Sequence, residues 1–270
     1  MRSIAVINQK GGVGKTTTAV NLGVALAQAG RRVCLIDMDP QAHATLHVGI
    51  EPRGERSSIY DVLVGDCPLT EVRQEIYPGF WVIPSDLDLA AAEVELAGVV
   101  GREMILRDKL REDNHPVDYL LVDCPPSLGV LTLNALTAVR ELIIPLQPHF
   151  LALHGLGKLL ETIELVAKRL NPALRVTGVV FCMYDATTRL AQEVIQDVEE
   201  FFASRPQKPS PWANVQIFQT RIRRNIRLAE APSFGQSIFQ YAPQSPGAED
   251  YRALAEELLR TAPPEPAASG

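Results

Sequence analysis

The sequence has few cysteines, few aromatic residues and no long apolar run. Aromatic residues make up 6% of the 270 residues. No apolar stretch reaches the ~20 residues of a membrane-spanning helix, and the first residues lead into a core strand rather than a signal peptide. The cysteines are far apart and lack metal-ligand spacing, so we expect a soluble protein of the reducing cytoplasm. They are Cys34, Cys67, Cys124 and Cys182.

The charge of the whole chain does not indicate a nucleic-acid-binding protein. The formal net charge is −6, and hydrophobic residues make up 46% of the sequence, which is ordinary for a globular protein with a large core. Any contact with DNA must therefore come from a local basic patch.

A glycine-rich stretch near the N-terminus has the setting of a phosphate-binding loop. An apolar run over residues 4–7 precedes it and a helical pattern follows, so main-chain N–H groups can surround a phosphate chain. In such a loop a lysine reaches the terminal phosphates and a threonine hydroxyl binds Mg²⁺. The expected nucleotide-binding residues are Lys10, Gly11, Gly12, Val13, Gly14, Lys15, Thr16 and Thr17.

This loop departs from the usual P-loop pattern at two positions. Gln9 occupies the place of the first glycine, and Lys10 adds a second cation. Lys10 either neutralises its own nucleotide or reaches a nucleotide held by a second subunit, as an arginine finger does. The alternative is a glycine-rich turn that only joins a strand to a helix.

Strand and helix patterns alternate along the chain, which predicts an α/β fold. We expect a single-domain P-loop NTPase over residues 1–260, a mostly parallel twisted sheet with helices on both faces, and a disordered tail over 261–270. The predicted strands are residues 3–7, 32–36, 80–83, 117–122, 141–145, 176–181 and 215–218. The predicted helices are residues 15–29, 58–64, 87–99, 102–111, 130–139, 151–170, 190–202 and 247–259.

Three aspartates follow predicted strands, at the sheet edge where ligands bind in open α/β folds. Asp123 follows an apolar run in the Walker B pattern and is a candidate Mg²⁺ ligand. Asp37 and Asp39 lie two residues apart on an extended segment, so their side chains share a face. One of them can brace the loop or the metal's water while the other orients the attacking water. The alternative is that these aspartates are turn residues that favour solubility.

Four arginines within seven residues form a local basic patch. Arg221, Arg223, Arg224 and Arg227 are suited to non-specific contacts with DNA phosphates. The alternative is a solvated stretch whose arginines pair with Glu230.

Five stretches together resemble the ParA/Soj family of deviant Walker A ATPases. They are residues 10–16, 36–41, 122–127, 145–153 and 224–235. The resemblance implies a slow ATPase that closes into an ATP-dependent homodimer with Lys10 and Gly12 at the interface. In that dimer Lys10 acts across to the partner, Lys15 and Thr16 bind phosphate and Mg²⁺, Asp39 positions water, and Asp123 is the Walker B carboxylate. With Lys10, Lys15 and Asp39 as the catalytic residues, we expect Thr16, Asp37 and Asp123 at the metal.

The resemblance also implies partners and a cellular role. The closed dimer binds non-specific DNA on the nucleoid, and a ParB-like partner stimulates hydrolysis during chromosome or plasmid partitioning. The adenine lies near Met183 and Pro232. Two departures concern Arg189, which is displaced by two positions, and His154, which replaces an acidic residue.

Four alternatives share parts of this pattern. A MinD-like membrane ATPase needs a terminal amphipathic basic helix, and the last nine residues do not form one. A nitrogenase-like iron protein needs cysteines placed to bind an iron–sulfur cluster, whereas Cys124 follows the Walker B aspartate and has no suitable companion. A ligase of the dethiobiotin or cobyrinate synthetase type and a ParA-like ATPase that positions another cargo both stay open.

Overall fold

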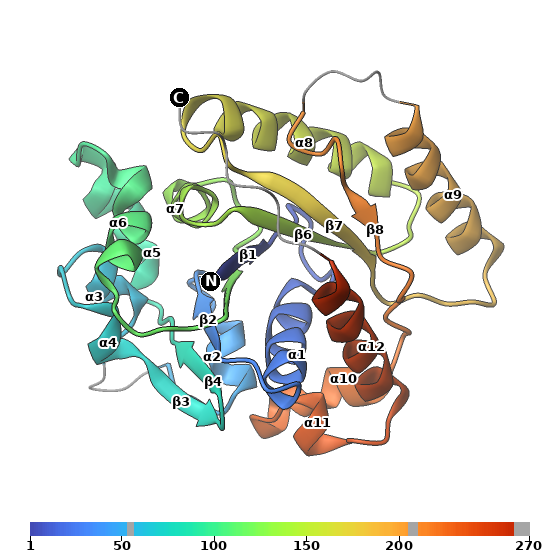
Figure 1. Ribbon diagram of the computed structural model, residues 1–270, viewed down its shortest axis with the longest axis horizontal. Coiled ribbons are helices and arrows are strands. Elements are labelled where there is room, and N and C mark those ends of the chain that lie inside the picture. Colours follow the sequence, from blue (N-terminus) through green and yellow to red (C-terminus); the bar gives the residue numbers. More distant parts are fainter. Residues whose placement is uncertain (53–56, 205–209, 262–270) are drawn as a thin grey trace.

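The computed structural model describes residues 1–52, 57–204 and 210–261. Its centre is an eight-stranded sheet in the order β3-β4-β2-β5-β1-β6-β7-β8 (Figure 1). Every strand pair is parallel except β3 with β4. The strands are β1 (Arg2–Val6), β2 (Val33–Asp37), β3 (Gln74–Tyr77), β4 (Phe80–Ile83), β5 (Tyr119–Asp123), β6 (Glu141–Leu146), β7 (Arg175–Phe181) and β8 (Gln216–Ile217).

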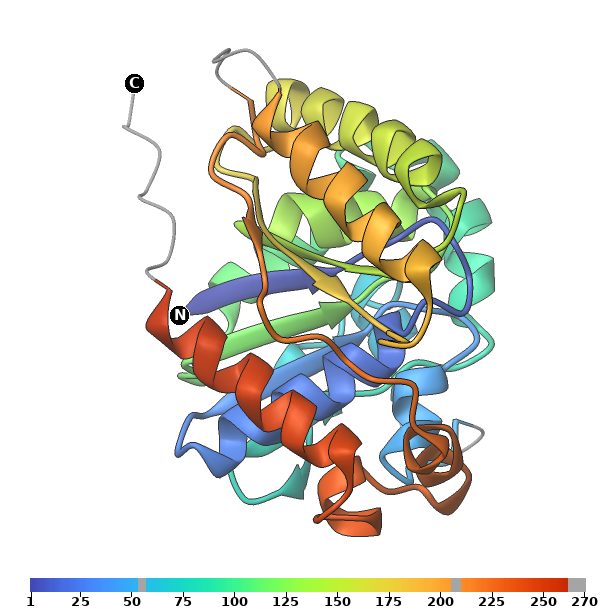
Figure 2. The same cartoon turned by 90° about the vertical axis from the view of Figure 1, so that its right-hand side faces the viewer.

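Helices cover both faces of the sheet, as Figure 2 shows for α8 and α9 on one side and α1 and α12 on the other. The first face carries α3 (Ile59–Leu63), α4 (Leu69–Val72), α5 (Leu89–Glu95), η1 (Leu96–Gly98), α6 (Ile105–Glu112), α7 (Val130–Ala138), α8 (Ala152–Arg169) and α9 (Arg189–Ala203). The second face carries α1 (Lys15–Gln28), α2 (His43–His47), α10 (Ile226–Glu230), α11 (Ile238–Tyr241) and α12 (Pro246–Arg260). Two short 3₁₀ turns, η2 (Arg102–Met104) and η3 (Ala231–Phe234), pack against α7 and α2.

The central strands are buried on both faces, and alternate residues supply the two cores. In β1, Ile4 and Val6 pack beneath α1 and α12, whereas Ala5 belongs to the core under α7 and α8. Successive side chains of a strand point to opposite faces, so a strand between two helical layers must be apolar throughout. The near-continuous apolar runs of the sequence therefore mark the middle of the sheet.

The predicted fold class is confirmed: the chain forms one mostly parallel sheet between two helical layers. Most predicted elements agree within two residues, and β4 agrees at both ends. The sequence did not predict β3, α2, α4, α10 or α11. Residues 262–270 of the predicted disordered tail lie outside the described residues. Within the described part of the chain, no helix is long and apolar enough to cross a membrane.

Candidate nucleotide-binding site and arginine segment

The three central strands bring the predicted site residues to one edge of the sheet. In the register of β2, β5 and β1, Asp123 lies beside Asp37 on one side and beside Val6 on the other. The glycine-rich loop begins directly after β1, and the Met38 N–H donates to the Asp123 carbonyl at 3.0 Å. The loop, Asp37 and Asp123 therefore meet at the carboxyl ends of parallel strands, where ligands bind in such folds.

Two glycines of the loop adopt conformations that other residues rarely take. Gly12 has φ +71° and Gly14 has φ +92°, and Gly14 is the residue from which α1 begins. A Cβ at Gly14 would lie 3.5 Å from the Cβ of Cys182 at the end of β7, whereas a Cβ at Gly12 would meet nothing. The conformation of the loop therefore requires glycine at both positions, and Gly12 has open space in front of it.

The two lysines of the loop lie in different environments. Lys15 is buried, its ammonium donates to the Lys10 carbonyl at 3.2 Å, and desolvation lowers its pKa. Lys10 is exposed, and its side chain forms no hydrogen bond or ion pair with any residue that the structure describes. Lys15 is thus held for a ligand inside the loop, while the Lys10 ammonium remains available to a group outside this chain.

Asn8 holds the start of the glycine-rich loop in place, and its role was not predicted from the sequence. Its side chain is buried, donates to the Pro145 carbonyl at 2.7 Å and accepts from the Lys10 N–H at 3.0 Å. The amide therefore ties the start of the loop to the end of β6. No local pattern points to this role, because the contact joins residues 137 apart in the sequence.

Asp123 and Thr16 form a pair suited to Mg²⁺. The Thr16 hydroxyl donates to Oδ2 of Asp123 at 2.7 Å, and Oδ1 of this buried carboxylate has no hydrogen-bond partner among the described residues. Burial raises the pKa of Asp123, and the charge of Asp37 raises it further. A buried, incompletely paired carboxylate is costly, and hard cations prefer carboxylate and hydroxyl oxygens. The residues present therefore fit a magnesium ion.

Asp37 is bound by the main chain around it. Its oxygens accept from the Asp39 N–H at 3.1 Å, the Thr45 N–H at 2.9 Å and the Thr45 hydroxyl at 2.7 Å. Burial raises its pKa to about 6. Asp39 is nearly buried, and its Oδ1 accepts from the Gln41 N–H at 3.0 Å. Each predicted carboxylate thus lies at the site, and Asp37 is the most fully hydrogen-bonded.

The two residues predicted near the adenine lie on different segments. Met183 follows β7 with φ +51°, next to the Cys182 that borders the glycine-rich loop. Pro232 lies in η3, which packs against α2. A Cβ at Gly235, directly after η3, would meet the Cα of Gly49 at 2.7 Å, so these two backbones are in close contact.

Acidic residues of α12 hold the main chain around the four arginines, residues 221–227, which we call the arginine segment. Glu257 accepts from the Gln219 and Thr220 N–H groups at 2.7 and 3.0 Å. Asp250 accepts from the Arg223 N–H at 2.8 Å. The segment also pairs with the end of β7, since the Ile222 N–H donates to the Phe181 carbonyl at 2.8 Å, and the Arg224 N–H donates to the Tyr184 carbonyl just beyond that strand. A helix and a strand therefore fix its path.

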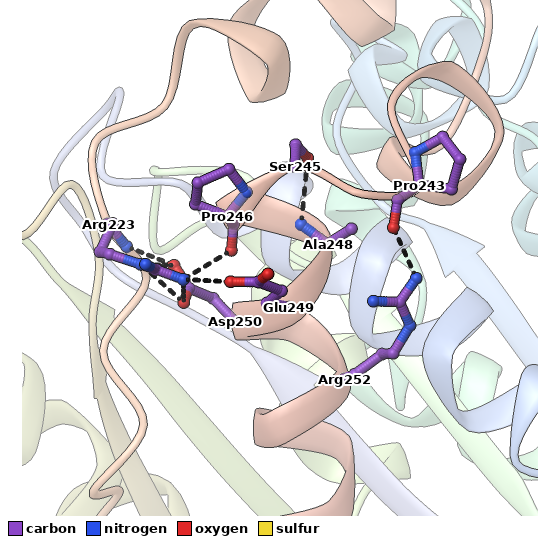
Figure 3. Close-up of polar contacts among 8 residues, drawn as sticks. All are labelled: Arg223, Pro243, Ser245, Pro246, Ala248, Glu249, Asp250 and Arg252. Atoms are coloured by element: carbon purple, nitrogen blue, oxygen red, sulfur yellow. Dashed lines mark hydrogen bonds and ion pairs between the residues drawn. The ribbon is translucent and has the colours of Figure 1, made fainter.

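Arg223 is committed to contacts inside the protein. Figure 3 shows its guanidinium on Asp250, Glu249 and the Pro246 carbonyl. The nearest of these contacts is 2.7 Å, to Oδ1 of Asp250. The carboxylates of Asp250 and Glu249 raise the pKa of Arg223. Its side chain thus anchors the segment to the start of α12, a role the sequence did not indicate.

The other three arginines are less constrained. Arg221 stacks over the Tyr184 ring at 5.0 Å, and Arg227 pairs with Glu230 at 2.8 Å, as the alternative prediction held. Arg224 is exposed, and its guanidinium forms no hydrogen bond or ion pair with any residue in the described ranges.

The arginine segment is connected to the glycine-rich loop through adjacent residues of α12. Tyr251 follows the Asp250 that holds Arg223, and its buried hydroxyl lies 3.2 Å from the Thr18 hydroxyl in α1. The Thr18 N–H in turn donates to the Gly14 carbonyl. A short path of direct contacts thus joins the loop to the segment.

Comparison with known proteins identifies the family. Residues 1–176 match a family model described as an AAA domain. The sporulation initiation inhibitor protein Soj of Bacillus subtilis is 45% identical over 256 residues, which cover 94% of this chain and 97% of Soj. The chain belongs to the Soj/ParA family. The chromosome partitioning protein ParA of Caulobacter vibrioides is 44% identical, over 96% of this chain and 94% of that protein.

A similar solved structure is a cobyrinic acid a,c-diamide synthase of Mycobacterium smegmatis with bound ADP and magnesium. It has a TM-score of 0.80 and 38% identity, and the match covers 96% of this chain and 94% of that one. Family membership confirms the predictions that the chain is an ATPase and that its cofactors are ATP and Mg²⁺.

Proposed function

We propose that the chain is an ATP-dependent, dimerising, DNA-binding ATPase of chromosome or plasmid partitioning. The observation that carries the proposal is the contrast between the two loop lysines. Lys15 is buried in the loop, whereas Lys10 is exposed and without a side-chain partner among the described residues. A cation fixed at its main chain and free at its ammonium suits a nucleotide on a second subunit.

In this proposal each site residue has a defined task. The N–H groups of residues 11–17 and the Lys15 ammonium bind the phosphates, and Thr16 and Asp123 hold Mg²⁺, which neutralises charge on the transferred phosphate. Asp39 orients the attacking water, and Lys10 stabilises the partner's nucleotide. We place Gly12 at the dimer interface, since the open space in front of it would let a second subunit approach closely.

Closure of the dimer then favours DNA binding by the arginine segment. Arg221, Arg224 and Arg227 contact phosphates, while Arg223 holds the segment on α12. If two subunits supply six contacts, affinity falls by about 10³-fold between about 50 and about 200 mM salt. Hydrolysis releases the DNA, and a ParB-like partner with a basic peptide accelerates that step on the nucleoid.

The test is co-sedimentation of an Asp39→Ala protein with DNA, with ATP, with ADP and without nucleotide. We expect binding that requires ATP and weakens steeply with salt. Arg224→Glu combined with Arg227→Glu should abolish it. The matched control is Arg111→Glu on α6, since Arg111 is also exposed and its ion pair in the described part of the chain is with Asp108 on its own helix.

Two outcomes contradict the proposal. DNA binding that is the same with ATP, with ADP and without nucleotide would contradict an ATP-dependent switch. Equal losses of DNA binding in the double variant and in the Arg111→Glu control would contradict the assignment of DNA binding to the arginine segment. Light scattering of the Asp39→Ala protein measures the dimer separately: ATP should double its mass, and the added Gly12→Val change should prevent that.

A second candidate is an ATP-dependent ligase, favoured by the 38% identity to the solved synthase. It predicts a rate of ATP turnover that rises when a carboxylic acid substrate and an amide donor are added and that does not change when DNA is added. A third candidate is positioning of another cargo, which predicts the same dimer and DNA binding with a different stimulating partner.

A further inference from the structure

Two hydroxyl groups outside the predicted site residues hold the segment that carries Asp37 and Asp39. Thr45 lies in α2 and Ser85 follows β4, and both are buried, with Thr45 at 0% and Ser85 at 1% exposure. They come from separate elements, 40 residues apart. Their contacts converge on Asp37, the last residue of β2, and on Asp39 just after it.

Thr45 binds the Asp37 carboxylate twice. Its N–H and its hydroxyl donate to the same oxygen, Oδ2, at 2.9 and 2.7 Å. The hydroxyl also accepts from the Ser85 N–H at 2.9 Å. Its single O–H is committed to Asp37, because an ionised carboxylate only accepts, while one of the hydroxyl's lone pairs accepts from Ser85.

Ser85 completes the arrangement from the other side. Its hydroxyl donates to the main-chain carbonyl of Asp39 at 2.8 Å. Asp37 in turn accepts from the Asp39 N–H at 3.1 Å. The peptide groups on both sides of Asp39 are thus held, one by Asp37 and the other by Ser85.

We infer that Thr45 is a positioning residue for ATP hydrolysis, acting through Asp37 and together with Ser85 on Asp39. In the described residues neither hydroxyl forms a hydrogen bond with the glycine-rich loop, so we assign both to the carboxylate segment rather than to the nucleotide. They fix the carboxylate segment in place, and groups that orient site residues in this way commonly change activity 10–100-fold when removed. The inference rests on the proposed role of Asp39 in orienting water.

The test compares Thr45→Val, which keeps the shape and removes the hydroxyl, with Thr45→Ser, which keeps the hydroxyl. Steady-state phosphate release with saturating DNA gives kcat and KM. We expect Thr45→Val to lower kcat by ~10–100-fold with the affinity for a fluorescent ATP analogue nearly unchanged. Thr45→Ser should restore most of the rate, and Ser85→Ala should lower kcat without a loss of ATP affinity.

The matched control is Thr137→Val on α7. Thr137 is also buried, and its hydroxyl donates to the main-chain carbonyls of Glu103 and Asn134, away from the site. Thr137→Val should lower the melting temperature and leave kcat unchanged. If Thr45→Val does not fold, the Ser85→Ala and Thr45→Ser rates still decide the matter.

The outcomes separate this inference from the proposed function. A wild-type rate in Thr45→Val, or equal losses in Thr45→Val and Thr45→Ser, overturns the positioning role. A wild-type rate in Asp39→Ala instead removes Asp39 from hydrolysis. If Asp39→Ala is inactive and both Thr45→Val and Ser85→Ala are fully active, only the present inference fails.

Discussion

Acid should destabilise this protein through one buried histidine. His47 lies in α2, is 1% exposed, and has no hydrogen-bond partner for Nε2 among the described residues. Burial lowers its pKa to about 4, compared with about 6.5 in an unfolded chain. The imidazole is therefore neutral in the folded protein at pH values where the unfolded chain already binds a proton.

The sign and size of the effect follow from this difference. Above pH ~6.5 the histidine is neutral in both states and its contribution to stability is complete. As the pH falls, only the unfolded chain takes up the proton, so the free energy of unfolding decreases. The loss is about 2 kcal/mol at pH 5 and approaches about 3 kcal/mol near pH 4.

Urea unfolding of wild type and His47→Met at about pH 7.5, 6 and 5 measures the effect. Methionine fills irregular apolar space and does not titrate, so the free energy of unfolding of wild type minus that of His47→Met should fall by about 2 kcal/mol from pH 7.5 to 5. His43→Met is the control, because His43 is exposed on the same helix. A difference between wild type and His47→Met that is the same at all three pH values would refute the reasoning.

Three further changes test other features. Glu141→Gln breaks the buried ion pair with Arg2, whose atoms are 2.7 Å apart, and should lower the free energy of unfolding by about 3–5 kcal/mol. Urea unfolding should show a lower midpoint, and a change as small as that for a surface ion pair would contradict this prediction. Gly178→Ala places a Cβ 2.1 Å from the buried Phe218 ring and should cost about 1–3 kcal/mol by the same assay; an unchanged midpoint would count against the close packing. Gly12→Val places a β-branched residue at φ +71°, so it should weaken binding of a fluorescent ATP analogue and, at saturating ATP, still remove the ATP-dependent dimer in light scattering; a dimer that persists at saturating ATP would mean the position lies outside the interface.

The centre of the fold was predictable because local composition determines it. Buried parallel strands are apolar on both faces, and each of β1, β2 and β5 was predicted within two residues of its bounds. The same reasoning placed Asp37 and Asp123 at one edge of the sheet. The register that makes these aspartates neighbours then follows from the pairing of their strands.

The elements that were missed depend on tertiary contacts. β3 is a half-exposed strand of four residues that pairs antiparallel with β4 across a turn at Gly79, which has φ +78°. α2 begins after Ala42 at φ +52°, with no side-chain cap to mark its start. Neither has a local signal, because hairpin pairing stabilises the first and packing against α1 and η3 the second.

Polar residues that hold the site escaped sequence reasoning for a related reason. Ser85 meets Thr45 and the Asp39 carbonyl only when β4 pairs with β2, and Arg223 meets Asp250 only when α12 packs beside the segment. A cluster of arginines predicts contacts with DNA phosphates, and Arg223 was included in that prediction. Its engagement by Asp250 and Glu249, 27 and 26 residues later, is visible only in the folded chain.

The strands at the two edges of the sheet bear on how copies of this chain can crowd together. β3 has four residues, a register shift and an antiparallel pairing, and β8 has two residues. Short or irregular edge strands are poor templates for the addition of another chain. Polymerisation through the sheet is therefore disfavoured, and copies of this chain at high local concentration should not join edge to edge into fibres.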